Sequence, residues 1–532
     1  MKKYFALAAC QFLFLMAFGQ KLNRPPNILF AIADDASWKH FSAYGCNWVN
    51  TPGFDQVASS GLLFNRAYTP NAKCAPSRAV ILTGRNSWLL EEAANHSPYF
   101  PAKFKTYAEA LAENGYFTGS VAKAWAPGDP GKINGKVRQL TGPKFDKHKT
   151  NAPTTGISDN DYSRNFEDFL DSKPVDKPFC FWFGSYEPHR DYEFRSGIKK
   201  GNKSISEIDE VPSFWPDVDS IRADMLDYAL ELEYFDSHLQ KMLKKLEDLG
   251  ELENTIVVVT ADNGMPFPRI KGQVYEYSNH LPLAISWPEG IKKPGRVIDD
   301  IVSFADFAPT FLELAGLNQN TSQMQSFSGR SLTDIFNSEK EGQVNMERSY
   351  QLLGKERHDV GRPNDEGYPV RGILKNDFLY LHNFKPERWP AGNPETGYLN
   401  CDGSPTKTYL LDTRRKKGDW TYWQWNFGKR AEEELYNIKE DPYCMHNLAA
   451  VPFWAEVKEA LKAEMTKRLT EEGDPRILGK GDIFDHYQYS GQVHDYYNRQ
   501  MNGEVIPAGW VNETDVDNDL AKQTESGQNM PN

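Results

Sequence analysis

The stretch Asn27-Ile28-Leu29-Phe30-Ala31-Ile32-Ala33, followed directly by Asp34-Asp35, indicates the fold class of this chain. A continuous apolar run of this length is typical of a strand that is covered on both faces. Thr255 to Thr260 is a second such run, and Phe179 to Gly184 is a third. Helical segments alternate with the strands from Asn27 to about Leu317, which predicts an α/β sheet with helices on both faces.

Polar residues follow two of these strands at the point where each strand ends. Asp34 and Asp35 come after the first run, and Asp262 and Asn263 come after the second. Ligands of open α/β sheets bind outside the carboxyl ends of the strands. Four oxygen donors suit Ca²⁺ or Mg²⁺ rather than zinc. Taken alone, each pair would favour turn and cap residues, which Asp and Asn commonly are.

A reactive side chain is predicted at the start of a helix. In Cys74-Ala75-Pro76-Ser77-Arg78, Pro76 suits a first helical turn, and Gly84 can end the helix. Cys74 then lies just before the helix N-terminus, where the dipole favours negative charge, so we expect a lowered thiol pKa. Arg78, one turn further on, can bind an anion at the same place. The alternative is a buried cysteine on a core helix.

The full pattern, Cys-x-Pro-Ser-Arg-x-x-x-Leu-Thr-Gly-Arg, resembles the signature of type I sulfatases. In that family the cysteine is oxidised to formylglycine, an aldehyde that acts as its hydrate, and a divalent cation lies beside it. The resemblance implies an alkaline-phosphatase-like α/β fold: a large mixed sheet flanked by helices, with a smaller C-terminal α+β subdomain that carries an antiparallel sheet. It also implies maturation by a formylglycine-generating or anaerobic sulfatase-maturing enzyme.

The resemblance assigns roles to single positions. It implies one cation per chain, Ca²⁺ ahead of Mg²⁺, held by Asp34, Asp35, Asp262, Asn263 and the converted Cys74. Arg78 would orient the hydrate, Lys123 and Lys271 would neutralise sulfate oxygens, and His189 would bind the bridging oxygen or protonate the leaving group.

One position departs from the family pattern. The family has His two residues after the lysine that matches Lys123, and this chain has Trp125. The group that accepts the proton from the hydrate is therefore open. We expect Trp125, Arg190 and His280 to contact substrate and to influence which substrate is chosen.

Two further stretches point to a branch of the family. Met265-Pro266-Phe267-Pro268 and Glu187-Pro188-His189-Arg190 resemble the sulfamidase-like sulfatases (N-sulfoglucosamine sulfohydrolases) and their bacterial polysaccharide-degrading relatives. The implied substrate is a sulfated glycan, either N-sulfated glucosamine or an O-sulfated marine polysaccharide such as ulvan. Two alternatives remain: a phosphonate or phosphodiester hydrolase of the same superfamily, and a non-catalytic glycan-binding relative.

The net charge restricts the possible binding partners, and the N-terminal segment indicates where the protein is located. The formal net charge is −12, which argues against nucleic-acid binding. Residues 1–19 are typical of a signal peptide, with Lys2 and Lys3 before an apolar run from Phe5 to Phe18. That run is too short for a membrane span, so we expect export to the periplasm or the medium without stable membrane insertion. A lipoprotein-like box ending at Cys10 is the alternative to soluble export.

The remaining expectations concern domains and cysteines. We expect a catalytic domain over 20–370, a C-terminal subdomain over 371–478 with a strand pair between Gly372 and Leu381, and a polar tail over 479–532 whose last fifteen or so residues are disordered. Besides Cys74, the mature chain has four cysteines, which permits two disulfides with the pairing open.

Overall fold

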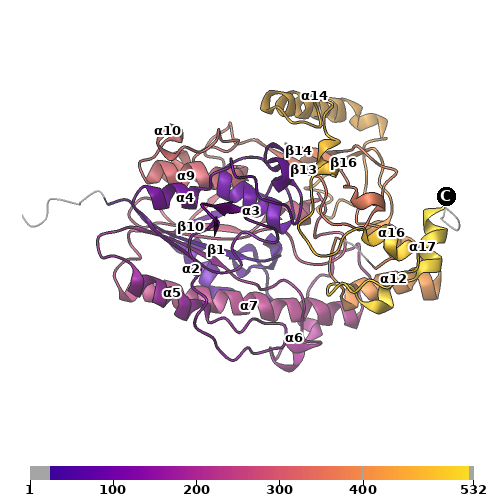
Figure 1. Cartoon of the computed structure of the whole chain (residues 1–532), viewed down its shortest axis with the longest axis horizontal. Helices are drawn as coiled ribbons and strands as arrows, with labels where there is room; N and C mark the ends of the chain where they lie inside the picture. The colour runs from indigo at the N-terminus through magenta and orange to yellow at the C-terminus, as the bar shows by residue number, and fades with distance from the viewer. Residues whose placement is uncertain (1–23, 398–399, 527–532) are drawn as a thin grey trace, which may run out of the picture.

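A computed structural model describes residues 24–397 and 400–526, so the predicted signal peptide over 1–19 lies outside the described residues. A seven-stranded mixed sheet forms the centre of the molecule, in the order β11-β2-β10-β8-β1-β7-β4 (Figure 1). Its strands are β1 (Asn27–Ala33), β2 (Leu62–Phe64), β4 (Phe117–Ala122), β7 (Phe179–Gly184), β8 (Thr255–Ala261), β10 (Leu283–Ser286) and β11 (Arg296–Ile298).

The parallel part of the sheet brings several strand ends together. β1 pairs in parallel with β8 on one side and with β7 on the other, and β4 runs parallel to β7. Ala33 lies opposite Ala261, and Ile32 lies opposite Gly184. The segments that follow β1, β7 and β8 therefore start from one edge of the sheet, as the sequence predicts.

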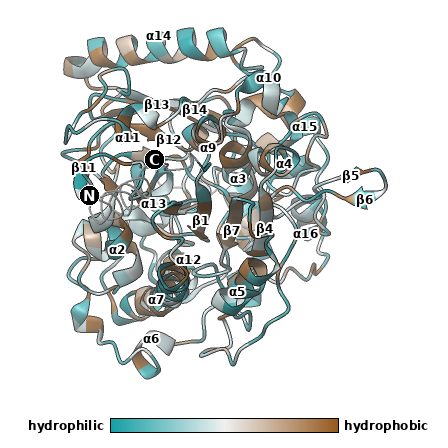
Figure 2. Cartoon of the chain, turned by 90° about the vertical axis from the view of Figure 1, so that its left-hand side faces the viewer, coloured by the Kyte–Doolittle hydropathy of each residue, from teal (hydrophilic) through white to brown (hydrophobic). Residues whose placement is uncertain are grey.

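Helices cover both faces of the sheet, which confirms the predicted fold class. One face packs against α3 (Cys74–Thr83), α4 (Tyr107–Glu113) and α9 (Phe307–Leu314), and the other packs against α2 (Pro52–Ser60), α5 (Tyr162–Ser172) and α7 (Asp219–Asp248) (Figure 1). Along β1, Ile28, Phe30 and Ile32 enter the first core, whereas Leu29 and Ala31 enter the second. Figure 2 shows these central strands as the most hydrophobic part of the chain.

The helix that carries the cysteine motif ends as predicted but begins at Cys74 itself rather than just after it. Cys74 is the first residue of α3, after Lys73 in extended conformation. Gly84 closes the helix with φ 69°, a left-handed conformation that glycine adopts without strain. All ten residues of α3 are buried, so the helix is fixed on every side.

A four-stranded antiparallel sheet forms the C-terminal part, in the order β13 (Tyr350–Lys355), β14 (Val370–Lys375), β15 (Phe378–Asn383) and β16 (Glu433–Asn437). The predicted strand pair is β14 and β15, joined by Asn376 and Asp377, which both have positive φ. Because β13 is part of this sheet, the sheet begins before residue 371, where the sequence suggests that the subdomain starts. Helix α14 (Ala455–Glu472) packs on the sheet through Leu461, Met465 and Leu469.

The polar tail is folded over its described length. It contains α15 (Ile483–His486), α16 (Tyr496–Met501) and α17 (Asn518–Glu525). The expected disorder of the last residues is therefore wrong for α17, which is capped by Asp517 and anchored by Glu525 Oε2, an acceptor for Trp389 Nε1 at 2.9 Å. Polar composition predicts disorder here because it does not reveal this cap or this anchor.

Most of the remaining elements are short. A second sheet joins β12 (Val302–Ser303), β3 (Ala67–Tyr68) and β9 (His280–Leu281), and β5 (Lys132–Ile133) pairs with β6 (Lys136–Val137) in a projecting hairpin (Figure 2). The other helices include the 13-residue α12 (Pro405–Lys417) and the shorter α6 (Ser196–Lys199), α8 (Glu276–Asn279), α10 (Gln319–Ser322), α11 (Thr333–Phe336) and α13 (Thr421–Phe427).

The structure bears on the sequence expectations about the cysteines and about membrane insertion. Cys46, Cys180, Cys401 and Cys444 are free thiols, so the disulfides that the sequence permits are not formed among them. In the described ranges, every helix is too short or too polar to cross a membrane.

Candidate active site

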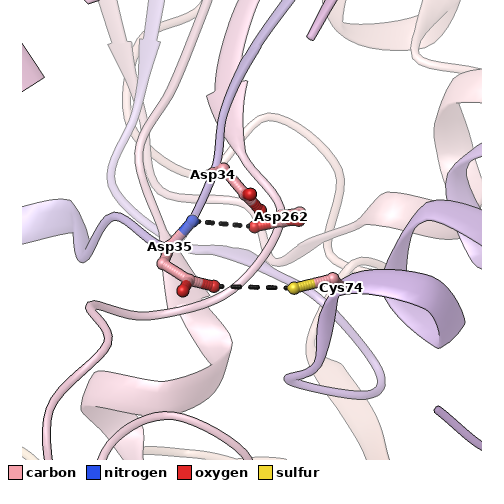
Figure 3. A group of neighbouring side chains, drawn as sticks. All are labelled: Asp34, Asp35, Cys74 and Asp262. Atoms are coloured by element: carbon pink, nitrogen blue, oxygen red, sulfur yellow. Dashed lines mark hydrogen bonds between the residues drawn. The ribbon is translucent and has the colours of Figure 1, made fainter. Parts of the chain in front are cut away.

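Four ligand-type side chains meet where β1 and β8 end and α3 begins. Asp34 and Asp35 follow β1, Asp262 follows β8, and Cys74 opens α3 (Figure 3). One ligand atom from each lies within 4.8 Å of the others, and all four residues are buried. Cys74 Sγ is 3.7 Å from Asp35 Oδ1, and the Asp35 backbone N–H donates to Asp262 Oδ1 at 3.0 Å. The structure thus brings the predicted metal ligands together.

The cluster fits a hard divalent cation. Asn263 lies beside it, and its Nδ2 donates to Asp35 Oδ1 at 2.7 Å. Its Oδ1 is buried and has no hydrogen-bond partner among the described residues. A buried acceptor without a partner costs free energy unless a ligand completes it. Carboxylate and amide oxygens at one point are the donor set of Ca²⁺ or Mg²⁺.

Two cations hold the carboxylates in place. Arg78 Nε donates to Asp262 Oδ2 at 2.8 Å, and Arg78 also reaches Asp34 Oδ1 at 3.3 Å. Lys123 Nζ donates to Asp34 Oδ1 at 2.7 Å. Gly184 permits this arrangement, because a Cβ there would lie 1.9 Å from the Lys123 carbonyl oxygen.

The charges of the site are strongly coupled. Burial raises the pKa of Asp34 to about 6, although the charge of Lys123 opposes the rise. Burial also acts to raise the pKa of Asp262, but Arg78 and Lys123 outweigh it and bring that pKa below its usual range. Burial similarly acts against ionisation of Asp35, and Lys271 and His189 reverse the effect, so the pKa of Asp35 is lowered.

The thiol of Cys74 differs from the sequence expectation. Burial raises its pKa well above the ordinary value, and the carboxylates of Asp34, Asp35 and Asp262 add to the rise against Lys123. The expectation of a lowered thiol pKa is therefore wrong for the unmodified residue. A helix N-terminus favours an anion, but full burial beside three carboxylates disfavours it more strongly.

A second group lies next to the first. Lys271 Nζ is 2.6 Å from Asp35 Oδ2, 2.9 Å from His189 Nε2 and 3.0 Å from Asp402 Oδ2. His189 Nδ1 contacts the Arg190 carbonyl oxygen at 2.6 Å. Because a carbonyl oxygen only accepts, Nδ1 carries the hydrogen, and Nε2 faces the Lys271 ammonium.

The three residues that the sequence predicts to contact substrate lie outside the two groups of side chains. Trp125 Nε1 donates to the Ala75 carbonyl at 3.0 Å, and its ring packs on Phe100. Arg190 forms two 2.8 Å hydrogen bonds to Asp224. His280 contacts Glu276 at 2.6 Å and stacks between Trp38 and Tyr68. The structure does not bring these three side chains into the groups described above.

A cavity of about 420 Å³ opens beside His189 and Lys271. Asp402, Lys73, His96 and Asp359 also line it, and sequence reasoning missed all four. The tail contributes a further wall, which includes Tyr489, Val493, Pro507, Ala508 and Trp510. A single Asp or His in a loop carries no local signal of function, and the long sequence separation of these residues hides their proximity.

Comparison with known proteins identifies the family. A family model described as Sulfatase matches residues 26–317, more than half of the chain. A model described as N-sulphoglucosamine sulphohydrolase, C-terminal, matches residues 270–370. The chain therefore belongs to the sulfatase family, whose members hydrolyse sulfate esters, and the resemblance seen in the sequence is confirmed.

Individual relatives agree with this assignment. The chain is 26% identical to an ulvan-active sulfatase of Formosa agariphila over 514 residues, covering 87% of this chain and 78% of the relative. It is 27% identical to human N-sulphoglucosamine sulphohydrolase over 511 residues, covering 88% and 95%.

Solved structures share the fold. BT4656 in complex with its substrate D-glucosamine-2-N,6-O-disulfate superposes with a TM-score of 0.62 at 20% identity, covering 85% of this chain and 99% of the other. The phosphonate monoester hydrolase of Agrobacterium radiobacter superposes with a TM-score of 0.55 at 16% identity, covering 85% and 96%. The fold alone thus does not separate sulfate from phosphonate chemistry.

Proposed function

We propose that this protein removes sulfate groups from a sulfated glycan or its oligosaccharides, using a formylglycine made from Cys74. The observation that carries the proposal is the position of Cys74, which opens α3 and lies 3.7 Å from Asp35 within a buried cluster of metal-type ligands. The hydrate of formylglycine would supply the nucleophilic hydroxyl at this position.

The same cluster would hold one divalent cation, Ca²⁺ ahead of Mg²⁺, through Asp34, Asp35, Asp262, Asn263 and the modified residue 74. The fit rests on the oxygen donors and on the unpartnered Asn263 Oδ1. When bound, the cation would polarise sulfate oxygens and lower the pKa of the attacking hydroxyl.

The chain's own cations have separate roles. Lys271 extends from the cluster to the cavity and would neutralise a sulfate oxygen as charge develops there. Lys123 and Arg78 keep Asp34 and Asp262 oriented, and Lys123 would also neutralise a sulfate oxygen. His189 lines the cavity, and with both ring nitrogens protonated its Nε2 would donate a hydrogen bond to the bridging oxygen or protonate the leaving group. The residue that accepts the proton from the hydrate stays open, because Trp125 cannot do so.

A glycan is the proposed substrate class for two reasons. The names of the relatives refer to ulvan and to N-sulphoglucosamine, and the cavity is large. About 420 Å³ lies within the range of pockets for small ligands, and part of its wall is apolar. The identities of 26% and 27% support the class without choosing between N-linked and O-linked sulfate. We also propose export through the N-terminal segment and maturation by a formylglycine-generating or anaerobic sulfatase-maturing enzyme.

The test is release of free sulfate by protein from a host with a maturation enzyme. The panel contains an aryl sulfate, sulfated glucosamines, ulvan oligosaccharides, a phosphonate monoester and a phosphodiester. Sulfate release with slower phosphonate and phosphodiester turnover supports the proposal. Faster phosphonate or phosphodiester turnover contradicts it, and glycan binding without any turnover indicates a non-catalytic relative.

A further inference from the structure

A carboxylate-anchored histidine lines the cavity, and the proposed chemistry does not use it. His96 Nδ1 lies 3.1 Å from Asp359 Oδ1, and Asp359 Oδ2 lies 3.0 Å from Lys73 Nζ. Lys73 directly precedes Cys74 and also donates to the Asn400 carbonyl at 2.8 Å. A short chain of polar contacts therefore runs from Lys73, the residue before the proposed nucleophile, through Asp359 to His96.

One ring nitrogen of His96 has no hydrogen-bond partner among the described residues. Burial lowers the pKa of His96 to about 4 although Asp359 opposes the change, so the imidazole is neutral at pH 7. The Asp359 carboxylate accepts the hydrogen on Nδ1, which leaves Nε2 as an acceptor. Nε2 is buried and has no hydrogen-bond partner among the described residues.

The backbone around His96 is held on two sides. Its N–H donates to the Arg357 carbonyl at 2.9 Å, in the segment that follows β13. The carbonyl of Ser97 accepts from both the N–H and the hydroxyl of Ser490 in the tail, at 2.8 and 2.9 Å. The position of His96 is thus set by two segments that are distant in sequence.

We propose that His96 is a specificity-determining residue, whose Nε2 accepts a hydrogen bond from a hydroxyl or amine hydrogen on the sugar that carries the scissile sulfate. This inference rests on the proposed sulfatase function. A sugar ring has apolar C–H faces and a rim of hydroxyl donors. The cavity offers an apolar wall from the tail, including Val493, Pro507 and Trp510, and a polar side that contains His96.

The tail wall is built from the C-terminal segment of the chain. The matched family models end at residue 370, whereas the wall and Ser490 lie beyond it. His96 is therefore held partly by Arg357, which the second family model covers, and partly, through Ser97, by the tail, which neither model covers. The choice of sugar would then depend on His96 and the tail wall rather than on the residues proposed to bind sulfate.

The experiment compares two kinds of sulfate ester. One is 4-nitrophenyl sulfate, which has no sugar hydroxyl. The other is the fastest substrate in a panel of sulfated glucosamines, galactoses and rhamnose. His96→Phe keeps a ring of similar shape and removes the acceptor, whereas His96→Gln can place an amide oxygen near the position of Nε2. His238→Phe is the matched control, because His238 is also buried, has a pKa lowered to about 4 and an unpartnered Nε2, but lies on α7 away from the cavity.

The measured quantity is the ratio of kcat/KM for the sugar to kcat/KM for the aryl ester. His96→Phe should lower this ratio about 10- to 100-fold, because a donor of the bound sugar loses its acceptor. His96→Gln should recover part of the loss, and His238→Phe should leave the ratio unchanged. An unchanged ratio in His96→Phe, with melting temperature preserved, overturns the inference while the proposed function stands. A wild-type enzyme that hydrolyses neither ester, or only the aryl ester, overturns the proposed function and the inference together.

Discussion

Lys271 Nζ donates to Asp402 Oδ2 at 3.0 Å while it also contacts Asp35 Oδ2 at 2.6 Å. This lysine therefore links the proposed metal site to the segment between β15 and β16, which carries Asp402. Burial acts to raise the pKa of Asp402, but Lys271 and His189 outweigh it and keep that pKa well below its usual range. Asp402 is thus a charged partner that holds Lys271 at the mouth of the cavity.

Asp402→Asn should lower kcat/KM for an aryl sulfate about 10- to 100-fold, because Lys271 loses one of the two carboxylates that position it. The measurement is steady-state kinetics with melting temperature recorded in parallel. Asp412→Asn is the control, since Asp412 pairs with the exposed Lys416 on α12. An Asp402→Asn enzyme with full activity would show that Asp402 does not position Lys271.

Cys74→Ala should reduce turnover at least about 10⁴-fold, because the proposed nucleophile is removed. The melting temperature should change little, since the substitution removes a single sulfur atom from an otherwise intact core. Cys46→Ala provides the comparison, because Cys46 is a half-buried free thiol outside the cluster. Retained activity in Cys74→Ala would rule out this residue as the nucleophile.

Removal of divalent cations should inactivate the enzyme and lower its melting temperature, and added Ca²⁺ should restore both. A ligand that binds only the folded state stabilises it by mass action. Asn263→Ala should raise the Ca²⁺ concentration needed for this stabilisation, because one oxygen donor is lost. A melting temperature that is indifferent to chelator and to Ca²⁺ in both proteins would count against the metal site.

Glu187 should make stability depend on pH. Burial raises its pKa from 4.5 to about 7 in the folded protein, although Ser158 N–H and Tyr162 hydroxyl donate to it. Between these values the folded state binds more protons than the unfolded state, so the free energy of unfolding falls as pH rises from about 4.5 to 7. The contribution amounts to about 3 kcal/mol over this window.

Glu187→Gln should remove that contribution, because an amide does not titrate. Urea unfolding at pH 5, 6, 7 and 8 measures it as the difference between the two proteins. The advantage of the wild type over Glu187→Gln should shrink with each step up to pH 7. Parallel stability curves for the two proteins would show that Glu187 titrates near its ordinary pKa when folded.

Local sequence patterns were sufficient for much of the fold. The runs that became β1, β7 and β8 are mostly apolar, and each is buried in the central sheet. β13 was not predicted, because Tyr350–Lys355 has no such run and its partner strand begins at Val370, beyond an intervening loop. Strand pairing across a loop is a tertiary property that a local pattern does not contain.

The residues of the candidate site likewise divide into those that a local sequence pattern predicts and those that it does not. Asp34, Asp35, Asp262 and Cys74 could be predicted because each follows or opens a recognisable element. Asp402 could not, since Cys401-Asp402-Gly403 has the composition of an ordinary turn. The raised pKa of the Cys74 thiol was also missed, because the helix dipole can be inferred locally whereas burial among three carboxylates cannot.

The mass of the peptide that carries Cys74 tests the proposed formylglycine most directly. The peptide is isolated from protein exported by a host with a maturation enzyme. Conversion to formylglycine removes one sulfur and two hydrogens and adds one oxygen. We predict this change in the active protein and its absence in Cys74→Ala. An active enzyme in which residue 74 is still an unmodified thiol would contradict this prediction.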